Sequence, residues 1–482
     1  MSEAVSSSVH EVDVAVLGGG PAGAVAALWA ARLGARTALI TRGAVGGMAA
    51  TDGPVPVRVL AHAARLRREA RQLGRHGIEI GELALDYGRL LENVREVVAE
   101  VGETTFAMPP QLQEVGVTVL DNVGTTSFID PHTLQAENGV RVHADKIIIS
   151  AGGTNRRLPV PGAELVGSHH DAWSLTSVPD SLLVIGAGAT GAQVASVFCE
   201  LGARVMLFEA GPRILATEDE EVSRVMADAF RASGIDVHEG FGRIVEFRQA
   251  GDRVRMVYAT DDGTQQVEAS LAVAAIGWLA DTAGLNLPAA GVQTNPRGYI
   301  QVDDQLRTTA PHIFAAGDIT GRLMLVPHAA QDGYLAATNA VRNRGVTLTP
   351  PVSPIGSFTD PEYAQAGLTE TKARADRDVV VAITPFAVAV RPIIDGRPTG
   401  FCKLIVDRAT HRMIGCHVVG ERAVELAQVA SVAIAAEMTV EQFARIPVSF
   451  PTYTNVLGRA VLDAAGQLGV DEFWDEERAS SE

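Results

Sequence analysis

The hydrophobic residues fall twice into the same order: an apolar run, a glycine-rich turn, an alanine-rich stretch and a second apolar run. The first copy is VDVAVL (12–17), GGGPAG, AVAALWAARLGA and TALI. The second copy is LLVIG (182–186), AGATG, AQVASVFCELGA and RVMLFEA. Short β-branched runs bounded by glycine predict strands, and the stretches between them have helical length. Each copy therefore predicts a strand–helix–strand unit of a parallel sheet, the architecture of nucleotide-binding domains.

The rest of the chain shows other patterns. Residues 56–105 are rich in Arg and Glu and have a helical period, whereas residues 115–150 alternate in the manner of strands. Further strands are expected around 242–276, and the buried run TTAPHIFAAGD (308–318) stops on a glycine and an aspartate. The proline-rich segment 347–354 is predicted to be a linker. Beyond it we expect strands at 379–384, 401–406 and 412–419, helices at about 423–437 and 440–445, and an acidic tail at 471–482.

Both glycine turns match the G-x-G-x-x-G pattern of dinucleotide-binding domains. Its first glycine permits a tight turn, the second lets backbone N–H groups approach a pyrophosphate, and the third lets helix and strand pack closely. The N-terminus of the following helix favours the phosphate charge. A single such turn also occurs in packed helix–strand joints, but two in this context predict two dinucleotide sites. The predicted turn residues are Gly18, Gly20, Pro21, Ala22 and Gly23 in the first copy and Gly186, Gly188, Thr190 and Gly191 in the second.

The residue expected to contact a ribose differs between the two copies. An acid about 20 residues after the glycine turn accepts hydrogen bonds from ribose hydroxyls. Glu209 has this place in the second copy and would repel a 2′-phosphate, so NADH is the expected nucleotide. Arg204 and Arg213 flank the same strand and leave NADPH open as an alternative. Thr41 is the equivalent residue in the first copy, where its hydroxyl can still bond a ribose.

Composition narrows the class of protein. The chain has 482 residues, 47% of them apolar, and its 40 basic and 57 acidic side chains give a formal charge of −17. Several domains with real cores are therefore expected, and nucleic acid and membrane surfaces are poor candidate partners. The three cysteines are too few for a secreted disulfide framework, and MSEAVSSSVHEVD does not resemble a signal peptide, so a cytoplasmic location is expected. Cys402 and Cys416 are predicted to be cross-strand neighbours, with two reduced core residues as the simpler interpretation.

The order GGGPAG, AGG (151–153), GAGATG, AIG (275–277) and IFAAGD resembles the pyridine nucleotide–disulfide oxidoreductase family, which includes glutathione reductase, dihydrolipoamide dehydrogenase and mercuric reductase. FTDPEYAQAGLTE (358–370) and GCHVVGERAVELAQVASVAI (415–434) are similar to its C-terminal dimerisation domain. The resemblance implies an α/β homodimer with two Rossmann-like dinucleotide-binding domains and a C-terminal α+β dimerisation domain. The implied ranges are 1–160 and 281–350 for the FAD-binding domain, 161–280 for the NAD(P)-binding domain and 351–482 for the dimerisation domain.

The resemblance also implies FAD in the first copy and a nicotinamide nucleotide in the second. Asp318 would bond the ribityl chain of FAD, and the helix that begins near His328 would point its N-terminus at the flavin, where reduction places negative charge. We interpret His328 as a neutral imidazole, with a proton donor as the alternative. The further residues implied for FAD are Gly47, Met48, Thr126, Gly152, Gly317 and Ala329, and Gly277 is implied for NAD.

The chain departs from the family pattern at its reactive groups. Ala49 and Pro54 stand where the family carries two redox-active cysteines. The family's H-P-T-x-S-E element reads FPTYTN at 450–455. The family's Lys–Glu pair under the flavin reads Arg58 and Gln193, and an arginine is a fixed cation that does not replace a lysine conservatively. Thiol relay chemistry is therefore not expected.

These departures predict an FAD-dependent NAD(P)H oxidoreductase that passes electrons directly to a small organic acceptor, a quinone or a conjugated carbonyl compound, and does not reduce disulfides. Arg58 would stabilise negative charge, and Gln193 would leave this cation without its ionic partner. Across the dimer, Phe450 would line an apolar site and Tyr453 or Asn455 would donate hydrogen bonds. The alternatives are a soluble pyridine nucleotide transhydrogenase, a biosynthetic flavin-dependent reductase or dehydrogenase, and a flavoprotein that has lost turnover and acts as a binding subunit.

Overall fold

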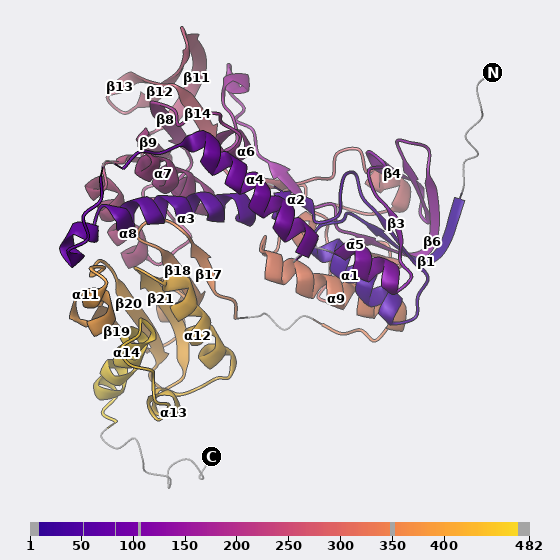
Figure 1. Ribbon diagram of the computed structural model, residues 1–482. Coiled ribbons are helices and arrows are strands. Elements are labelled where there is room, and N and C mark those ends of the chain that lie inside the picture. The colour runs from indigo at the N-terminus through magenta and orange to yellow at the C-terminus, as the bar shows by residue number, and fades with distance from the viewer. Residues whose placement is uncertain (1–8, 52, 82, 105–107, 348–351, 471–482) are drawn as a thin grey trace. The chain divides into compact units, whose positions relative to one another are not determined.

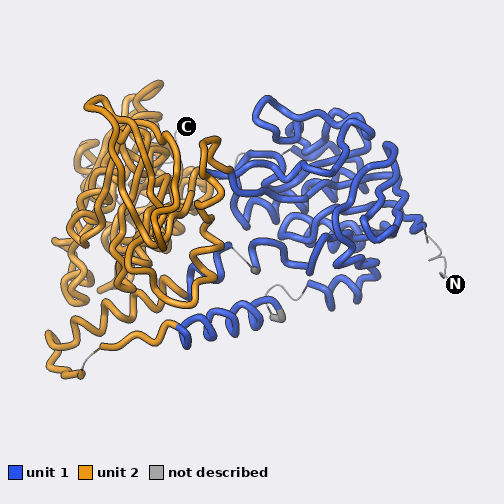
Figure 2. Tube along the Cα trace, turned by 90° about the horizontal axis from the view of Figure 1, so that it is seen from above, with its two compact units in different colours: residues 1–59, 88–156, 277–349 blue, residues 60–87, 157–276, 350–482 orange. Residues whose placement is uncertain are grey.

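The computed structural model describes residues 9–51, 53–81, 83–104, 108–347 and 352–470. Half of the expected linker, residues 348–351, falls outside these residues, and the expected acidic tail falls wholly outside them. The chain forms two compact units (Figures 1 and 2). Unit 1 comprises residues 1–59, 88–156 and 277–349, and unit 2 comprises residues 60–87, 157–276 and 350–482. The predicted NAD(P)-binding and dimerisation domains thus share one unit, and the domain boundaries given above stay predictions.

Unit 1 is built on a sheet of seven strands whose central members are parallel. The second half of β1 is buried at every position, as expected for a parallel strand that is covered on both faces. The sheet order is β3 (Thr118–Leu120), β2 (Thr37–Ile40), β1 (Val9–Leu17), β6 (Arg141–Ile149), β5 (Thr133–Ala136) and β4 (Thr126–Asp130), with β16 (Ile313–Ala315) on β6. The β4–β5 and β5–β6 pairs are antiparallel, and the other pairs of this sheet are parallel.

Two helices of unit 1, α1 (Pro21–Arg32) and α9 (Val326–Arg342), pack against each other and against this sheet. A Cβ added to Gly333 would lie 2.3 Å from the Ala22 carbonyl oxygen, so the two helix backbones touch. The opposite face is covered by the β4–β5 hairpin and by residues 285–319. The smaller elements of unit 1 are α2 (Gly47–Thr51), α5 (Met108–Glu114), β7 (Gly153–Asn155), β15 (Trp278–Ala280), η3 (Leu287–Ala290) and η4 (Gly317–Thr320).

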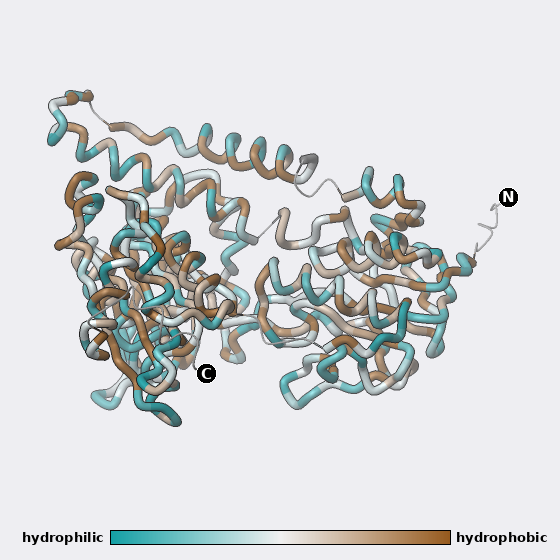
Figure 3. The backbone as a smooth tube through the Cα atoms, turned by 90° about the horizontal axis from the view of Figure 1, so that it is seen from below, coloured by the Kyte–Doolittle hydropathy of each residue, from teal (hydrophilic) through white to brown (hydrophobic). Residues whose placement is uncertain are grey.

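The expected helical region 56–105 contains two long helices, α3 (Pro54–Ala70) and α4 (Tyr87–Thr104), with the short η1 (Leu73–His76) after α3. Hydrophobic and hydrophilic positions alternate along α4 with the turns of the helix (Figure 3). Residues 78–81 and 83–86 form no regular structure. The cause is local, because Gly77 ends η1 with φ of +72°, a conformation that a helix cannot continue.

The nucleotide-binding part of unit 2 has a parallel four-stranded sheet in the order β10 (Asp236–Glu239), β9 (Arg204–Glu209), β8 (Ser181–Ile185) and β14 (Leu271–Ala274). The expected strands at 242–276 are β14 and an antiparallel meander. The meander consists of β11 (Arg243–Ala250), β12 (Arg253–Thr260) and β13 (Gly263–Ala269). The helices here are η2 (Ala163–Leu165), α6 (His169–Trp173), α7 (Ala189–Leu201) and α8 (Glu220–Ala232).

The C-terminal part of unit 2 is an antiparallel sheet in the order β17 (Ile355–Ser357), β18 (Tyr363–Gly367), β21 (Met413–Val419), β20 (Phe401–Asp407) and β19 (Val379–Pro385). The helices α12 (Ala423–Ala435), α13 (Val440–Ala444) and α14 (Thr454–Gln467) cover its core face. The shorter helices are α10 (Glu370–Arg374), η5 (Phe386–Val388) and α11 (Val390–Ile394). The predicted strands and helices at 379–445 are present within two residues of their expected bounds.

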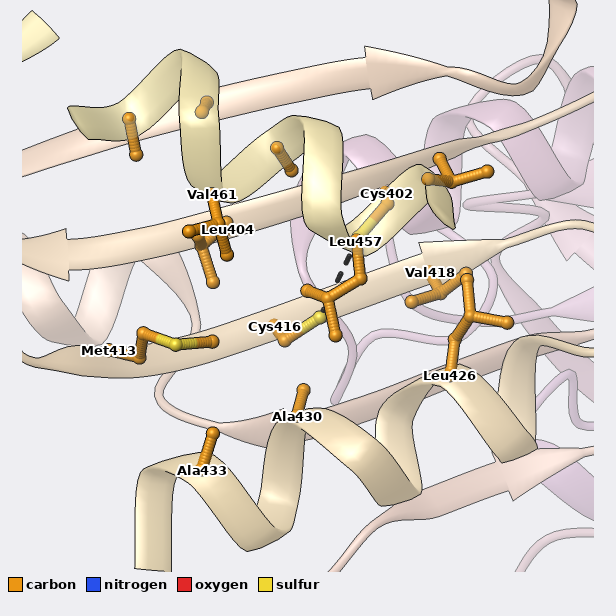
Figure 4. Close-up of a cluster of buried hydrophobic side chains, with 14 of the residues drawn as sticks. Cys402, Leu404, Met413, Cys416, Val418, Leu426, Ala430, Ala433, Leu457 and Val461 are labelled. Carbon is orange, nitrogen blue, oxygen red and sulfur yellow. Dashed lines mark hydrogen bonds between the residues drawn. The ribbon is translucent and has the colours of Figure 1, made fainter. Parts of the chain in front are cut away.

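Cys402 and Cys416 lie in this core with their sulfur atoms 3.8 Å apart, beneath Leu457 of α14 (Figure 4). They are diagonal neighbours, because Cys402 pairs with Val418 and Leu404 pairs with Cys416. The symmetry of the sequence had placed the two cysteines opposite each other. Val406 pairs with Met413 rather than with Arg412, and an irregularity between Ile405 and Val406 shifts the register by one more residue, so the two cysteines become diagonal neighbours.

The predicted fold class is confirmed: an α/β chain with two Rossmann-like parts and a C-terminal α+β part. Among the described residues, no helix combines the length and the apolar character that crossing a membrane requires.

Candidate functional site

The first glycine turn connects β1 to α1 and has the three-part geometry that its pattern predicts. Gly18 has φ of +109°, and a Cβ there would lie 2.2 Å from the Ser150 carbonyl oxygen. A Cβ on Gly23 would lie 1.8 Å from the Gly18 carbonyl oxygen, so strand and helix are in contact. At Gly20, by contrast, an added Cβ would meet no described atom within 4 Å. The turn is closed toward the protein and open where a pyrophosphate would approach.

The second glycine turn, in unit 2, repeats this geometry between β8 and α7. Gly186 has φ of +92°, and its added Cβ would lie 2.5 Å from the Ala275 carbonyl oxygen. A Cβ on Gly191 would lie 1.8 Å from the Gly186 carbonyl oxygen, the same distance as in unit 1. Around Gly188 the space within 4 Å is again open among the described residues. Each unit therefore presents one dinucleotide cradle.

Two residues predicted to contact FAD carry buried polar atoms that have no hydrogen-bond partner in the described part of unit 1. These atoms are Thr126 Oγ1 and His328 Nε2, on side chains that are 5% and 6% exposed. A buried polar atom without a partner is costly, and a bound ligand is one way to satisfy it. Together with the open space at Gly20, these atoms fit FAD. When bound there, FAD would supply a two-electron carrier between a nicotinamide nucleotide and a second substrate.

The Gly317–Asp318 turn follows β16 and lies between α1 and α9. A Cβ on Gly317 would lie 3.1 Å from Ala22 Cβ and 3.5 Å from Ala329 Cβ, so the turn contacts both helices. The Gly317 N–H donates a hydrogen bond of 3.1 Å to Asp332 Oδ2. The predicted ribityl ligand, Asp318, is thus carried by a turn that is fixed on both sides.

Burial shifts the pKa values of two side chains near this turn, Asp318 and His328. Burial raises the pKa of the Asp318 carboxyl, and the nearby charge of Asp332 adds to this effect. Burial lowers the pKa of His328, and the Arg322 cation acts in the same direction, while Asp332 opposes them. A lowered pKa favours a neutral imidazole at physiological pH. This agrees with our interpretation of His328 from the sequence.

Glu209 ends β9 beside the second glycine turn. Its Oε2 accepts the Ala187 N–H at 2.9 Å, and its Oε1 accepts the Gly211 N–H at 2.8 Å. Each carboxylate oxygen has a further lone pair, so the group can still accept ribose hydroxyls. The carboxylate therefore holds the turn, and its role in repelling a 2′-phosphate stays a prediction.

The two arginines that left NADPH open are poorly suited to that role. Arg204 begins β9, at the end opposite to Glu209. The Arg213 guanidinium donates to the backbone oxygens of Glu218 and Ala216 and also to Ser223 Oγ. Arg213 is therefore committed to internal contacts, and Arg204 lies a strand length away. These placements support the expectation of NADH.

The segment that carries the family's cysteines starts against the first glycine turn. A Cβ on Gly47 would lie 2.8 Å from Gly20 Cα, so α2 begins in contact with the FAD cradle. Ala49 is buried in α2. The Gly53 N–H donates to the Met48 carbonyl oxygen at 2.7 Å and turns the chain toward α3. The exposed Pro54 begins α3.

The predicted Arg58–Gln193 replacement falls on two different units. Arg58 is exposed on the part of α3 that belongs to unit 1. Gln193 is half-buried on α7 of unit 2 and donates through Nε2 to the Ala189 carbonyl oxygen at 3.3 Å. The roles of both residues toward a flavin stay predictions.

The three C-terminal candidates have different surroundings. Phe450 is 67% exposed, and its role across a dimer stays a prediction. Asn455 is half-buried in the first turn of α14. Tyr453 is buried, packs near Phe386 and donates its hydroxyl hydrogen to Asp395 Oδ2 at 3.0 Å. The only hydroxyl hydrogen of Tyr453 is therefore engaged within its own subunit, which favours a structural role over the expected donation to a substrate.

The remaining predicted residues lie in turns, near helix starts or at strand ends. Gly152 and Gly277 have φ of +79° and +99°, and Gly277 begins the third segment of unit 1 rather than lying in unit 2. Its assignment to NAD stays a prediction. The others are at helix starts or strand ends: Pro21 and Ala22 on α1, Thr41 after β2, Met48 on α2, Thr190 on α7 and Ala329 on α9.

Two residues of the FAD cradle were missed from the sequence. Ser150 Oγ is buried and lies 3.0 and 3.1 Å from the backbone oxygens of Leu17 and Gly18, which share its one hydroxyl hydrogen, and this contact fixes the first turn. Its signal was its place at the end of the strand run KIIIS, directly before the AGG turn. Asp332 lies within α9, and no local pattern distinguishes it.

Comparisons with known proteins identify the class. The model of the family described as "Pyridine nucleotide-disulphide oxidoreductase" matches residues 12–333, and that of its dimerisation domain matches residues 353–461. The chain belongs to the pyridine nucleotide-disulphide oxidoreductase family. It is an oxidoreductase, and the expected cofactors FAD and NAD(H) are confirmed for the family.

Among individual proteins, the chain is 30% identical to dihydrolipoyl dehydrogenase of Chlorobaculum tepidum, over 95% of this chain and 98% of that protein. It is 29% identical to a mercuric reductase of Bacillus cereus, over 94% of this chain and 71% of that protein. Its structure is similar to that of the HOCl-induced flavoprotein disulfide reductase RclA from Escherichia coli. The TM-score is 0.83 at 25% identity, over 93% of this chain and 99% of the other.

These relatives contradict our expectation of a quinone or conjugated carbonyl acceptor and of a chain that does not reduce disulfides. Full-length relatives are named dihydrolipoyl dehydrogenase, and a structural relative is named a disulfide reductase. The expectation rested on departures from the family pattern: Ala49 and Pro54, the FPTYTN segment, and the Arg58–Gln193 replacement. Absent side chains exclude one relay, but they do not identify the acceptor, and the inference was wrong for that reason.

Proposed function

We propose that this chain is an FAD-dependent oxidoreductase that exchanges electrons between NAD(H) and a dithiol/disulfide substrate. The observation that carries the proposal is the match over nearly the whole chain to proteins named dihydrolipoyl dehydrogenase. The two open glycine turns support it, because they provide one cradle for each nucleotide. In the reducing direction NADH gives up a hydride, which supplies two electrons and one proton, and water supplies a second proton, so that the substrate S–S bond becomes two thiols.

We infer that no protein disulfide stands between the flavin and the substrate. The support is the buried Ala49 in α2 and Pro54 at the start of α3, where the resemblance places the cysteine pair. Cys402 and Cys416 are fully buried in the C-terminal core, and Cys199 lies on α7. In this proposal the chain holds the two cofactors and admits the sulfur substrate to the bound flavin.

The proposal is tested by anaerobic reduction of the purified holoprotein with NADH, followed by reoxidation with oxidised lipoamide, oxidised glutathione and cystine. At least one disulfide is expected to restore the oxidised flavin spectrum faster than buffer alone, with release of about two thiols per flavin. Flavin that NADH reduces but that none of the disulfides reoxidises would contradict the proposal.

A matched control separates binding from folding. Gly20 has an extended backbone (φ −71°) and open space around its added Cβ, so Gly20→Ala places a methyl group toward the FAD cradle without a clash inside the protein. This variant is expected to fold and to lose FAD together with disulfide turnover.

A second variant tests the absence of a cysteine relay by replacing Cys199 with Ser and both Cys402 and Cys416 with Ala. Retained disulfide reduction supports the absence of a protein relay, and specific loss of it with the flavin still reducible by NADH contradicts that part.

We further propose a homodimer and a cytoplasmic location. The C-terminal part of unit 2 exposes large apolar side chains, among them Val432 at 61% and Phe450 at 67%, which supports coverage by a second subunit. Three free cysteines support a reducing compartment. Light scattering on wild type and Val432→Glu tests the dimer: a dimeric wild type and a monomeric variant are expected, whereas a monomeric wild type would contradict it.

A further inference from the structure

The carboxylate of Asp332 is the point at which α9 holds the Gly317–Asp318 turn. Asp332 is 6% exposed, and its Oδ2 accepts the Gly317 N–H at 3.1 Å. Gly317 has φ of +75° and is packed between Ala22 and Ala329, so this amide has little freedom to turn toward another acceptor. Without the carboxylate, a buried N–H would be left without its partner.

The position of this carboxylate is set by helix packing. The next residue, Gly333, has no side chain, and an added Cβ would lie 2.3 Å from the Ala22 carbonyl oxygen. The close approach of α9 to α1 that this glycine allows brings Asp332 beneath the turn that carries Asp318. One helix contact thus fixes two parts of the FAD cradle, the start of α1 after the first glycine turn and the Gly317–Asp318 turn.

The charge of Asp332 also acts on the groups around it. Its negative charge raises the pKa of Asp318 and opposes the lowering of the His328 pKa. Burial raises the pKa of Asp332 itself, while the hydrogen bond from the Gly317 N–H and the Arg322 cation oppose this rise and favour the charged carboxylate. A negative charge close to the cradle disfavours further negative charge there, and flavin reduction adds such charge.

We propose that Asp332 is a positioning residue for FAD: its carboxylate presets the Gly317–Asp318 turn for the ribityl chain, and its charge lowers the reduction potential of the bound flavin. The proposal rests on the placement of FAD in unit 1. It concerns cofactor binding and does not depend on which substrate accepts the electrons, so a failed disulfide assay would leave it standing.

The test compares Asp332→Ala, which removes the acceptor, with Asp332→Asn, whose amide oxygen can still accept the Gly317 N–H but carries no charge. The readouts are the Kd of the apoprotein for FAD, by quenching of flavin fluorescence, and the midpoint potential of the bound flavin. We expect Asp332→Ala to raise the Kd by about tenfold or more. We expect Asp332→Asn to change the Kd less and to shift the midpoint potential to a more positive value.

Two controls keep the proposal open to contradiction. Gln331→Ala, on the exposed neighbouring residue, is expected to change neither readout. Urea unfolding of each apoprotein separates cofactor positioning from general stability. A lowered unfolding midpoint of Asp332→Ala with a wild-type Kd for FAD would overturn the positioning role, and an unchanged potential in Asp332→Asn would overturn the role of the charge. A wild-type chain that binds no FAD would instead overturn the placement of FAD itself.

Discussion

Lys403 Nζ lies 2.7 Å from Asp219 Oδ1 in the interior of unit 2, and both side chains are at most 5% exposed. Lys403 lies on β20, and Asp219 is the N-cap of α8 in the nucleotide-binding part. A second carboxylate, that of Glu370, lies 2.6 Å from the same nitrogen. The backbone N–H of Glu370 also donates a hydrogen bond to Asp219 Oδ2. This ion triad links the C-terminal sheet to the nucleotide-binding part of the same unit.

Lys403→Met is expected to destabilise the protein strongly. The methionine removes the cation and leaves the carboxylate of Asp219 buried without its partner, a change that typically costs about 3–5 kcal/mol. Urea unfolding should show this loss in the free energy of unfolding. Lys372→Met, at an exposed lysine, should stay within about 0.5 kcal/mol of wild type. Equal stabilities of the two variants would show that the triad contributes no more than a surface lysine.

The buried Glu218, next to Asp219, is expected to make the stability of the protein depend on pH. Burial raises the pKa of its carboxyl to about 7. The folded protein therefore keeps this proton after the unfolded chain has lost it, and stability falls as pH rises from about 4.5 to 7. The pKa of Asp219 is lowered, so its contribution is lost only in the acid range below about pH 4.

The Glu218 effect is measured by comparing wild type with Glu218→Gln at pH 5 and pH 8. The glutamine side chain stays uncharged at both values, so the variant should gain stability relative to wild type at pH 8, on the order of 2–3 kcal/mol. Glu220→Gln, at an exposed acid of the same helix start, serves as the control. A difference between wild type and Glu218→Gln that is the same at both pH values would contradict a raised pKa.

The second glycine turn offers a pair of matched substitutions. Gly188 has φ of −74° and open space around its added Cβ, whereas a Cβ on Gly191 would lie 1.8 Å from a backbone oxygen. Gly188→Ala should therefore fold normally, retain FAD and raise the KM for NADH by about tenfold or more. Gly191→Ala should lower the thermal unfolding midpoint instead. A Gly188→Ala variant with wild-type KM for NADH would show that the nucleotide does not approach this turn.

Much of the fold and of both cradles could be predicted because the signals are local. The functions of Gly18, Gly20 and Gly23 follow from their spacing after a strand, and the structure gives each the expected surroundings. The interaction of Lys403 with Asp219 could not be predicted, because it joins residues 184 positions apart whose meeting depends on how a sheet packs on a helix start. The electron acceptor was predicted wrongly because the replacement of the family's reactive side chains was interpreted as a change of substrate.

We expect the carboxylate of Glu209 to determine the preference for NADH over NADPH. Its carboxylate accepts two backbone N–H groups and keeps a negative charge at the ribose position, while Arg213 is engaged elsewhere. Glu209→Gln removes the charge but keeps an oxygen acceptor, so the preference for NADH in kcat/KM should fall by about tenfold, mainly through better use of NADPH. Steady-state kinetics with both nucleotides measure this ratio, and Glu220→Gln is the charge-matched control. An unchanged ratio would mean that Glu209 does not face the ribose.

The last prediction concerns the reactivity of the thiols. The Cys402 and Cys416 thiols share a hydrogen bond, and both side chains are fully buried. This hydrogen bond and the burial raise the pKa of Cys402. The thiolate is the reactive form, so neither thiol should react with a disulfide reagent such as DTNB in the native protein. Cys199 is half-buried and also has a raised pKa, so at most one slow equivalent is expected. Denaturant should release three equivalents, and mass spectrometry after alkylation should find modification at Cys199 alone in the native state. Rapid native labelling at Cys402 or Cys416 would show that this core opens.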